Sequence, residues 1–242
     1  GADNAYHVVT GADGAILDGV TISNGNANGE CTYCDIGGGM FNNSGSPTIN
    51  DVRFIRNHAE TAGGGFYNES GSPFLKNITF EGNTSQFGGG MTDSGSSNLT
   101  NITFYDNTAQ YGGGMTAYGG TLLTNGTFSS NSASADGGGV YLWGSSATLT
   151  NLTFKANTAG QGGGVTARFG SPEIRNTIFW ENFASLGSQI YEDSSTLTVS
   201  SCVVEGGYVG GANIIAENPQ LGPLGDHGGS TETVPLLAGS SA

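Results

Sequence analysis

A triple glycine recurs through most of the chain at intervals of 24 to 26 residues. It occupies positions 37–39, and its first glycine returns at positions 63, 88, 112, 137 and 162. Tandem units of this length are typical of proteins built by stacking one small supersecondary unit on the next. The repeat therefore constrains the fold more strongly than any single motif does.

Alignment of the repeats on their glycines gives three columns of apolar residues. The first column holds Ile49, Leu75, Leu99, Leu123, Leu149, Ile174 and Val199. The second holds Phe54, Phe80, Phe104, Phe128, Phe154, Phe179 and Val204. The third holds Met40, Phe66, Met91, Met115, Val140, Val165 and Ile190, and so contains all three methionines of the chain. These columns mark the residues that we expect to face a common core.

Apolar and polar residues alternate at period two within a repeat, as in the Val52/Phe54 and Ile102/Phe104 pairs. This alternation indicates strands, and no sustained helical stripe accompanies it. Strands this short cannot bury their own apolar faces and must stack on neighbouring units. We predict an all-β, single-domain, right-handed parallel β-helix of about eight to nine rungs of about 25 residues, roughly 38 Å long.

The predicted rungs occupy residues 1–215, with an insertion loop at 23–36 between the first two. Leu17 and Ile22 fall in register before the first triple glycine, and Ile215 follows Ile190 by 25 residues in the third column. Residues 216–242 form an irregular C-terminal tail that we expect to act as a cap or as a segment between subunits.

The glycines precede the third apolar column, where a side chain would crowd the coil or forbid a positive φ, so we interpret them as a corner. Two columns of asparagine flank the Phe column. Those three residues after it, predicted to be a structural ladder, are Asn57, Asn83, Asn107, Asn131, Asn157 and Asn182. Those three residues before it are Asn77, Asn101, Asn125, Asn151 and Asn176. Stacked amides at corners can hydrogen-bond from rung to rung.

Composition excludes several classes of partner. The chain of 242 residues has 6 lysines and arginines against 20 acidic residues, and its net charge is −14. So few cations cannot neutralise a row of phosphates, so we expect neither nucleic acid nor an anionic membrane as a partner. No apolar run reaches the length of a membrane span. The opening sequence GADNAYHVV has neither Met nor a signal sequence, so we expect a processed or excised product.

The sequence Cys31-Thr-Tyr-Cys34 lies in the predicted insertion. This spacing allows a local disulfide, inert thiols, redox chemistry or half of a zinc site, and we favour the first two because nothing completes a metal site. Cys202 aligns with Ile102 in an inward column and is predicted to be a buried thiol.

No residues of the chain form a recognisable catalytic or metal-binding group. His7, His58 and His227 lie in different repeats or in the tail, and the acidic residues are dispersed. DHGG at 226–229 resembles an element of pectin hydrolases but has no paired aspartates. The slot that carries Asp in calcium-binding solenoids holds residues such as Phe41 and Tyr67 instead. We therefore expect no enzyme activity, no metal and no cofactor.

A candidate ligand patch runs along the outside of the predicted rungs. Tyr118, Trp143 and Arg168 stack on successive rungs, beside an outward column with further aromatic residues. Exposed rings next to an arginine can hold a sugar or a partner protein. Cross-rung packing that only stiffens the surface is the alternative. The eight N-x-S/T sequons are interpreted as by-products of the Asn and Thr columns.

The segments DNAYHVVTG, AILDGVTISNGNAN, the repeated GGGM with NxTFxxN, and the tail NPQLGPLGDHGGSTETVPLLAGSSA carry a family likeness. Together they resemble bacterial right-handed β-helix proteins of the choice-of-anchor Q type, related in repeat style to polymorphic outer-membrane proteins. The resemblance implies a secreted or cell-surface protein and brings no catalytic motif.

The predicted rod has two unlike ends, and the first rung near Tyr6 to Val9 presents an open sheet edge. Contacts between unlike ends propagate into filaments when no ring closes. We expect a non-enzymatic extracellular structural protein whose copies stack head-to-tail into a fibre. A surface adhesin or glycan-binding module is the alternative, with surface glycans or proteins as partners, and a polysaccharide-active enzyme is less favoured.

Overall fold

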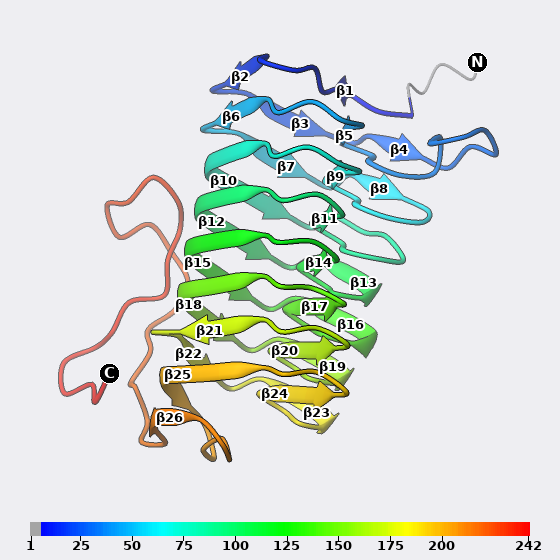
Figure 1. The fold of residues 1–242 in the computed structure, drawn as a ribbon. Coiled ribbons are helices and arrows are strands. Elements are labelled where there is room, and N and C mark those ends of the chain that lie inside the picture. Colours follow the sequence, from blue (N-terminus) through cyan, green and yellow to red (C-terminus); the bar gives the residue numbers. More distant parts are fainter. Residues whose placement is uncertain (1–5) are drawn as a thin grey trace.

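A computed structural model describes residues 6–242; residues 1–5, the start of the first predicted rung and of the opening sequence, lie outside it. The described chain winds into a stack of parallel coils, with β1 at one end and β26 at the other (Figure 1). Every strand pair within the coils is parallel, and the described residues contain no helix. The predicted all-β solenoid is confirmed.

Two sheets form the walls of the coil. The first has eight strands, and one full turn of the chain lies between each strand and the next. These strands are β1 (Val9–Thr10), β5 (Met40–Asn42), β9 (Phe66–Asn68), β11 (Met91–Asp93), β14 (Met115–Ala117), β17 (Val140–Trp143), β20 (Val165–Arg168) and β24 (Ile190–Asp193). The second has twelve: β2 (Ile16–Asp18), β3 (Thr21–Ser23), β6 (Thr48–Asn50), β7 (Arg53–Ile55), β10 (Phe74–Glu81), β12 (Asn98–Tyr105), β15 (Leu122–Ser129), β18 (Thr148–Lys155), β21 (Glu173–Arg175), β22 (Ile178–Trp180), β25 (Thr198–Val204) and β26 (Ala212–Ile215).

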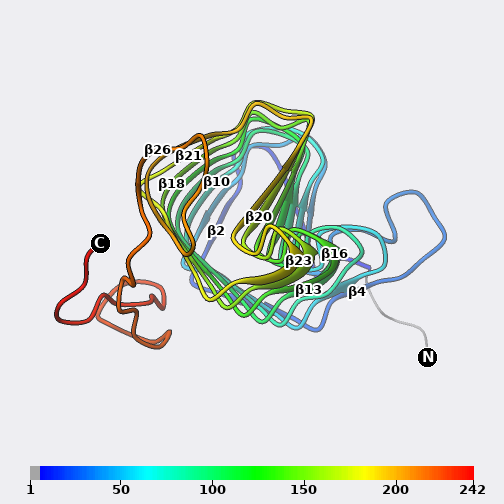
Figure 2. The ribbon, with the colours of Figure 1, turned by 90° about the horizontal axis from the view of Figure 1, so that it is seen from below.

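A side arm projects from each coil before the triple glycine, next to the eight-stranded sheet (Figure 2). Its strands form a four-stranded and a two-stranded sheet. These are β13 (Thr108–Tyr111), β16 (Ser132–Asp136), β19 (Thr158–Gln161) and β23 (Phe183–Leu186), and β4 (Asn26–Ala27) with β8 (His58–Ala59). The arm is the part of the fold that positions the candidate site.

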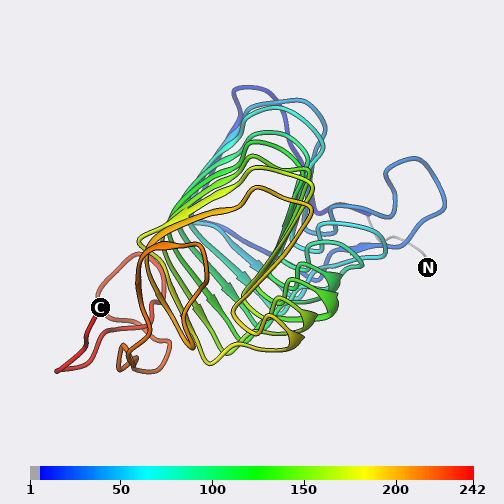
Figure 3. The same cartoon turned by 60° about the horizontal axis from the view of Figure 1, so that its bottom comes forward.

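The three predicted apolar columns line the interior of the coils, which Figure 3 shows closing around a common core. Met40 pairs with Phe66, and Ile49 pairs with Leu75, in the register that the alignment predicts. The rings from Phe54 to Phe179 are fully buried and stack with centroids 4.5 to 4.9 Å apart, close to the spacing of the strands themselves. Identical side chains therefore repeat because the backbone spacing repeats.

The triple glycine is a corner that no side chain could occupy. The first glycine of each triplet has a positive φ, as at Gly137, where φ is 68°. A Cβ on the middle glycine, Gly138, would lie 2.6 Å from the carbonyl oxygen of Thr158. Backbone conformation and backbone packing thus both require glycine here.

The six asparagines predicted as a ladder lie in one buried column. Asn107 is typical: its Nδ2 donates to Asn131 Oδ1 at 2.9 Å and to the carbonyl of Phe80 at 2.9 Å. Its Oδ1 accepts hydrogen bonds from the backbone N–H and from Nδ2 of Asn83. The residue before it, Asp106, has a φ of 56°, so the ladder holds a strained corner at each coil.

The second asparagine column forms an outer ladder with weaker burial. Asn101 Nδ2 donates to Asn77 Oδ1 at 3.0 Å, and Asn125 Nδ2 to Asn101 Oδ1 at 3.4 Å. These residues themselves have φ near 58°, which asparagine tolerates better than other side-chain-bearing residues.

Two boundaries differ from the sequence prediction. β3 and β4 place residues 23–27 in register with the next coil, so only residues 28–35 leave the stack. The predicted register of Ile215 with Ile190 is wrong, because Ile215 pairs with Val203 in the other sheet. Glycines with positive φ at 206, 207 and 210 turn the chain back early, so the ninth coil skips the eight-stranded sheet.

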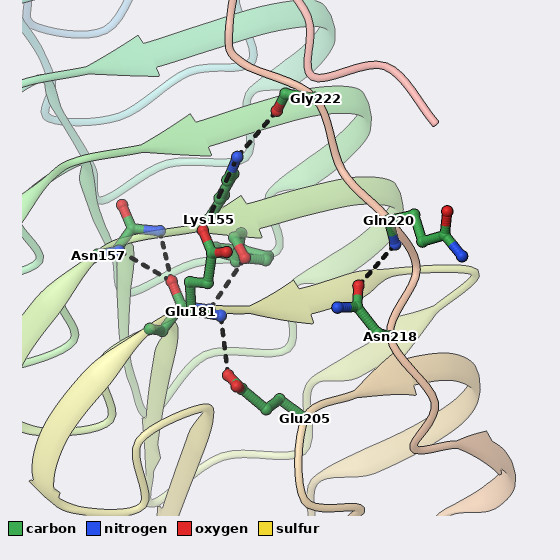
Figure 4. A network of polar contacts seen from close by, with 9 residues as sticks. Lys155, Asn157, Glu181, Glu205, Asn218, Gln220 and Gly222 are labelled. Atoms are coloured by element: carbon green, nitrogen blue, oxygen red, sulfur yellow. Dashed lines mark hydrogen bonds and ion pairs between the residues drawn. The ribbon is translucent and has the colours of Figure 1, made fainter. Parts of the chain in front are cut away.

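The tail does not cap the last coil, contrary to one of the two predicted roles. It runs back along the flank of the stack, beside the twelve-stranded sheet (Figure 1). Thr103 Oγ1 donates to the carbonyl of Glu232 at 2.7 Å, and Lys155 Nζ donates to the carbonyl of Gly222 at 2.8 Å (Figure 4). Val234 is buried against the flank, which offers an apolar contact as well as hydrogen-bond donors.

Candidate functional site

A groove of about 530 Å³ lies between the side arm and the end of the eight-stranded sheet. One wall carries the residue that directly precedes a triple glycine, as at Phe87, Tyr111 and Asp136. The opposite wall carries the predicted patch, Tyr118, Trp143 and Arg168. Tyr141 lines the floor between them.

Register explains how these residues meet. Trp143 and Arg168 are paired residues of neighbouring strands β17 and β20, and Tyr111 pairs with Asp136 between β13 and β16. The coil turns sharply at the triple glycine, so residues seven apart come together: Arg168 Nη2 donates to Gln161 Oε1 at 2.9 Å, and Tyr111 and Tyr118 both line the groove. The two middle coils therefore contribute a residue to each wall, and the coils of Phe87 and Arg168 contribute to one wall each.

A threonine ties the arm to the sheet in several coils. Thr92, Thr116 and Thr166 each donate their hydroxyl to the carbonyl of the residue that precedes the triple glycine, at 2.8 to 2.9 Å. Tyr141 occupies the same position in the intervening coil. Tyr141 has an aromatic ring where the other coils have the threonine hydroxyl. The groove therefore has an aromatic floor at this coil.

Aromatic rings follow one another along the groove. The rings of Phe87 and Tyr111 stack with centroids 5.1 Å apart and an interplanar angle of 11°. Tyr111 and Tyr141 are 5.3 Å apart, and Tyr141 and Trp143 are 6.0 Å apart. Trp143 also meets Phe169 edge to face at 4.7 Å. Together they form a continuous aromatic strip parallel to the axis of the stack.

The outward column with aromatic residues is less exposed than the sequence suggests. Phe41 and Tyr141 are only 6% and 4% exposed, because the side arm packs against the face on which they lie. Trp143, beyond the arm, is 43% exposed. The outward aromatic column is thus covered at Phe41 and Tyr141, and the most exposed ring of the groove is Trp143.

Arg168 is held by acceptors on three sides. Its Nη1 donates to Asp193 Oδ2 at 2.5 Å, and its Nη2 donates to Gln161 Oε1 at 2.9 Å and lies 3.4 Å from Asp136 Oδ2. Its guanidinium also lies over the ring of Tyr191, 5.6 Å from the centroid. The side chain is 18% exposed, so its charge is largely neutralised within the wall.

Burial raises the pKa values of three titratable side chains that line the groove. Desolvation raises the pKa of the Asp136 carboxyl above its usual value; the Arg168 charge opposes this shift and Asp193 adds to it. Burial likewise raises the pKa of the Tyr118 and Tyr141 phenols. Both phenols are therefore neutral at physiological pH and carry O–H donors.

The other predicted residues lie away from this groove. Cys31 and Cys34 form a disulfide in the loop at 28–35, where Tyr33 stacks on Phe41 with centroids 5.0 Å apart. Cys202 is buried in the core as a free thiol. His7 and His58 make separate contacts, to the carbonyl of Gly37 and to Thr84 Oγ1. Among the residues from 6 onward, no group of three or more His, Cys, Asp or Glu side chains could hold a metal.

Sequence reasoning missed one whole wall of the groove. Phe87, Tyr111 and Asp136 each directly precede a triple glycine. Alignment on the glycines brings these residues into one column, but the column mixes aromatic and acidic residues and so shows no repeated pattern. Only the fold places it opposite Tyr118 and Trp143.

Comparison with protein families gives one match. A family model described as a right handed beta helix region matches residues 90–221, which is just over half of the chain. This chain belongs to the right-handed β-helix family. The matched region of the β-helix includes every lining residue of the groove except Phe87. Neither the curated proteins nor the solved structures contain a significant match.

Among residues 6–242, no α-helix has the length and apolar character needed to cross a membrane.

The groove offers three kinds of contact at once. Its rings present apolar surface, its phenols present hydroxyl donors, and Asp136 presents a partly buried acceptor. Such a combination suits a ligand that has apolar faces and many hydroxyl groups.

Proposed function

We propose that this β-helix is a carbohydrate-binding module of a secreted or cell-surface protein. The observation that carries the proposal is the groove that Phe87, Tyr111, Tyr118 and Trp143 line together. The C–H faces of sugar rings pack on aromatic side chains, while their hydroxyls need nearby donors and acceptors. The likeness to choice-of-anchor Q proteins supports a location outside the cell. No bond-breaking step is part of this proposal.

Affinity electrophoresis and calorimetry with soluble polysaccharides test the proposal. We expect saturable binding that falls at least tenfold in Trp143→Ala, because this is the most exposed ring of the groove. Tyr105→Ala is a matched control, since Tyr105 is 37% exposed on the twelve-stranded sheet, away from the groove. Equal binding by both variants and the unmodified protein, or no binding of any polysaccharide, would contradict the proposal.

Head-to-tail stacking into a fibre is the second candidate function. Among the described residues, β1 and β24 each have a strand partner on one side only. Both terminal coils carry exposed apolar side chains, with Ile16 74% exposed on the first and Phe183 67% exposed near the last. A second copy would continue the apolar columns of the first. Such contacts between unlike surfaces form open filaments.

Electron microscopy and analytical ultracentrifugation over a range of concentrations test stacking. Filaments or concentration-dependent oligomers are the expected result. Ile16→Lys should disrupt them, because it places a charge in the proposed contact between apolar surfaces. Dispersed single rods at every concentration would contradict stacking.

A further inference from the structure

We infer that the groove takes an uncharged glycan chain that lies parallel to the axis of the stack, and that it selects against anionic glycans. This inference rests on the proposed carbohydrate-binding function and names the class of ligand. Its two parts depend on separate observations: the direction of the aromatic strip, and the bonding of the one arginine in the groove wall.

The direction of the strip determines how a ligand lies. Phe87, Tyr111, Trp143 and Arg168 come from four successive coils. Neighbouring parallel strands are about 4.8 Å apart, so the first and the fourth coil are separated by roughly 14 Å. A single sugar ring would cover only one or two of these positions. A chain of several sugars, extended along the axis, would contact all four.

The walls of the groove leave room for a chain that runs along the axis of the stack, and they restrict a chain that runs across it. The side arm, with β13 and β16, stands beside the end of β20 along the length of the stack (Figure 2). Ring-to-ring spacings along the strip, 5.1 Å and 5.3 Å, follow the spacing of the coils. Successive sugars of an extended chain thus meet successive rings, and each added sugar gains contact area until the strip ends.

Charge determines which chains are accepted. Arg168 is the only cation that lines the groove, and its Nη atoms already face Asp193, Gln161 and Asp136. A carboxylate or sulfate on the ligand would have to displace one of these acceptors. It would also lie close to two carboxylates, in a protein whose net charge is −14. A neutral chain incurs neither cost, so the groove favours it.

Asp193 is the residue through which this selection can be altered. It holds Arg168 Nη1, but it does not line the groove itself. Asp193→Asn removes one negative charge and weakens the hold on the guanidinium. We expect the ratio of anionic to neutral glycan affinity to rise at least fivefold in this variant. Glu192→Gln, one residue earlier and outside the groove, is the control for the loss of a surface charge.

The test uses polymer pairs that share a backbone and differ in charge. Suitable probes are hydroxyethyl cellulose with carboxymethyl cellulose, and fully methyl-esterified with de-esterified polygalacturonan. At low ionic strength the neutral member of a pair should bind at least tenfold more tightly than the anionic one. Among neutral oligosaccharides, the affinity should rise with each sugar up to about three or four units and then level off.

The outcomes separate this inference from the proposed function. Tighter binding of the anionic member, lost in Trp143→Ala, would overturn the inference and leave a glycan-binding groove in place. Affinity that is already maximal for a monosaccharide would overturn the axial chain. No binding of any polymer, or binding that Trp143→Ala leaves unchanged, would overturn both. Trp143→Phe, which keeps a ring, should retain most of the affinity, because the contact needs an aromatic face at this position.

Discussion

At the scale of single residues, asparagine has different structural roles in the inner and outer ladders. Asn107 is fully buried, and its side chain makes four hydrogen bonds, three to ladder asparagines and one to the Phe80 carbonyl. Asn125 is exposed and belongs to the outer ladder, where its main role is to adopt a φ of 58°. Buried polar groups that lose their partners cost far more than exposed ones.

Replacement of Asn107 by Ala should therefore lower the free energy of unfolding by about 3 kcal/mol or more, because it leaves the Phe80 carbonyl and the Asn83 N–H without partners. Asn125→Gly is the matched control and should cost about 1 kcal/mol or less, since glycine adopts the same φ. Urea unfolding followed by circular dichroism measures both. Equal losses in the two variants would contradict the distinction between the ladders.

Asp136 should make stability depend on pH. Its pKa in the folded protein is raised by burial, so the folded state binds its proton more tightly than the unfolded state does. Its contribution to stability therefore falls as pH rises from the usual carboxyl pKa through the raised one. Asp136→Asn, which resembles the protonated form, should gain stability over the unmodified protein above that window and lose the advantage below it. Thermal unfolding from pH 3 to pH 8 measures the difference, and a constant offset would contradict it.

At the scale of the repeated element, the triple glycine allows two parts of one coil to face each other. The turn brings the arm back onto the sheet at backbone contact distance, and Gly138 packs directly between the carbonyls of Thr158 and Gly163. Because the arm lies that close, the residue before the glycines reaches the groove opposite Trp143. The same turn thus builds the coil and the groove.

Gly138→Ala should prevent folding or cost more than about 4 kcal/mol, because its Cβ would meet backbone on both sides and the coils cannot move apart. Gly144→Ala is the control: φ there is 61°, but only the Phe169 carbonyl at 3.8 Å is near. We expect it to cost about 1 to 2 kcal/mol, from backbone strain alone. Soluble yield and thermal unfolding compare the two. Similar, small losses would show that steric crowding at the corner is not decisive.

At the scale of the whole molecule, the tail and the coils are held by different means. Neighbouring coils share continuous parallel ladders and a common core. The tail is held by isolated bonds, such as those from Lys155 (Figure 4) and Thr103, and by the burial of Val234. Segments with few buried contacts open locally at low free energy.

Limited proteolysis with a glutamate-specific protease should therefore cut at Glu217 and Glu232 well before Glu60, Glu173 or Glu181. The fragment that ends at Glu217 should keep the β-sheet circular dichroism spectrum, because its ladders are intact. Mass spectrometry identifies the sites. Early cleavage within the coils, with the tail intact, would contradict this order of stability.

The sequence by itself determined the coils. The period of the glycines, the three apolar columns and the asparagine ladder all follow from local spacing, because one strand spacing fixes every repeat. It also placed Tyr118, Trp143 and Arg168 in one column. Only the tertiary structure decided what faces them. Asp136 and Tyr111 are close in sequence to that column, yet they reach the groove only because the arm folds back at the glycines. The early turn before Ile215 and the path of the tail depend on packing between distant segments, which periodicity within a repeat does not encode.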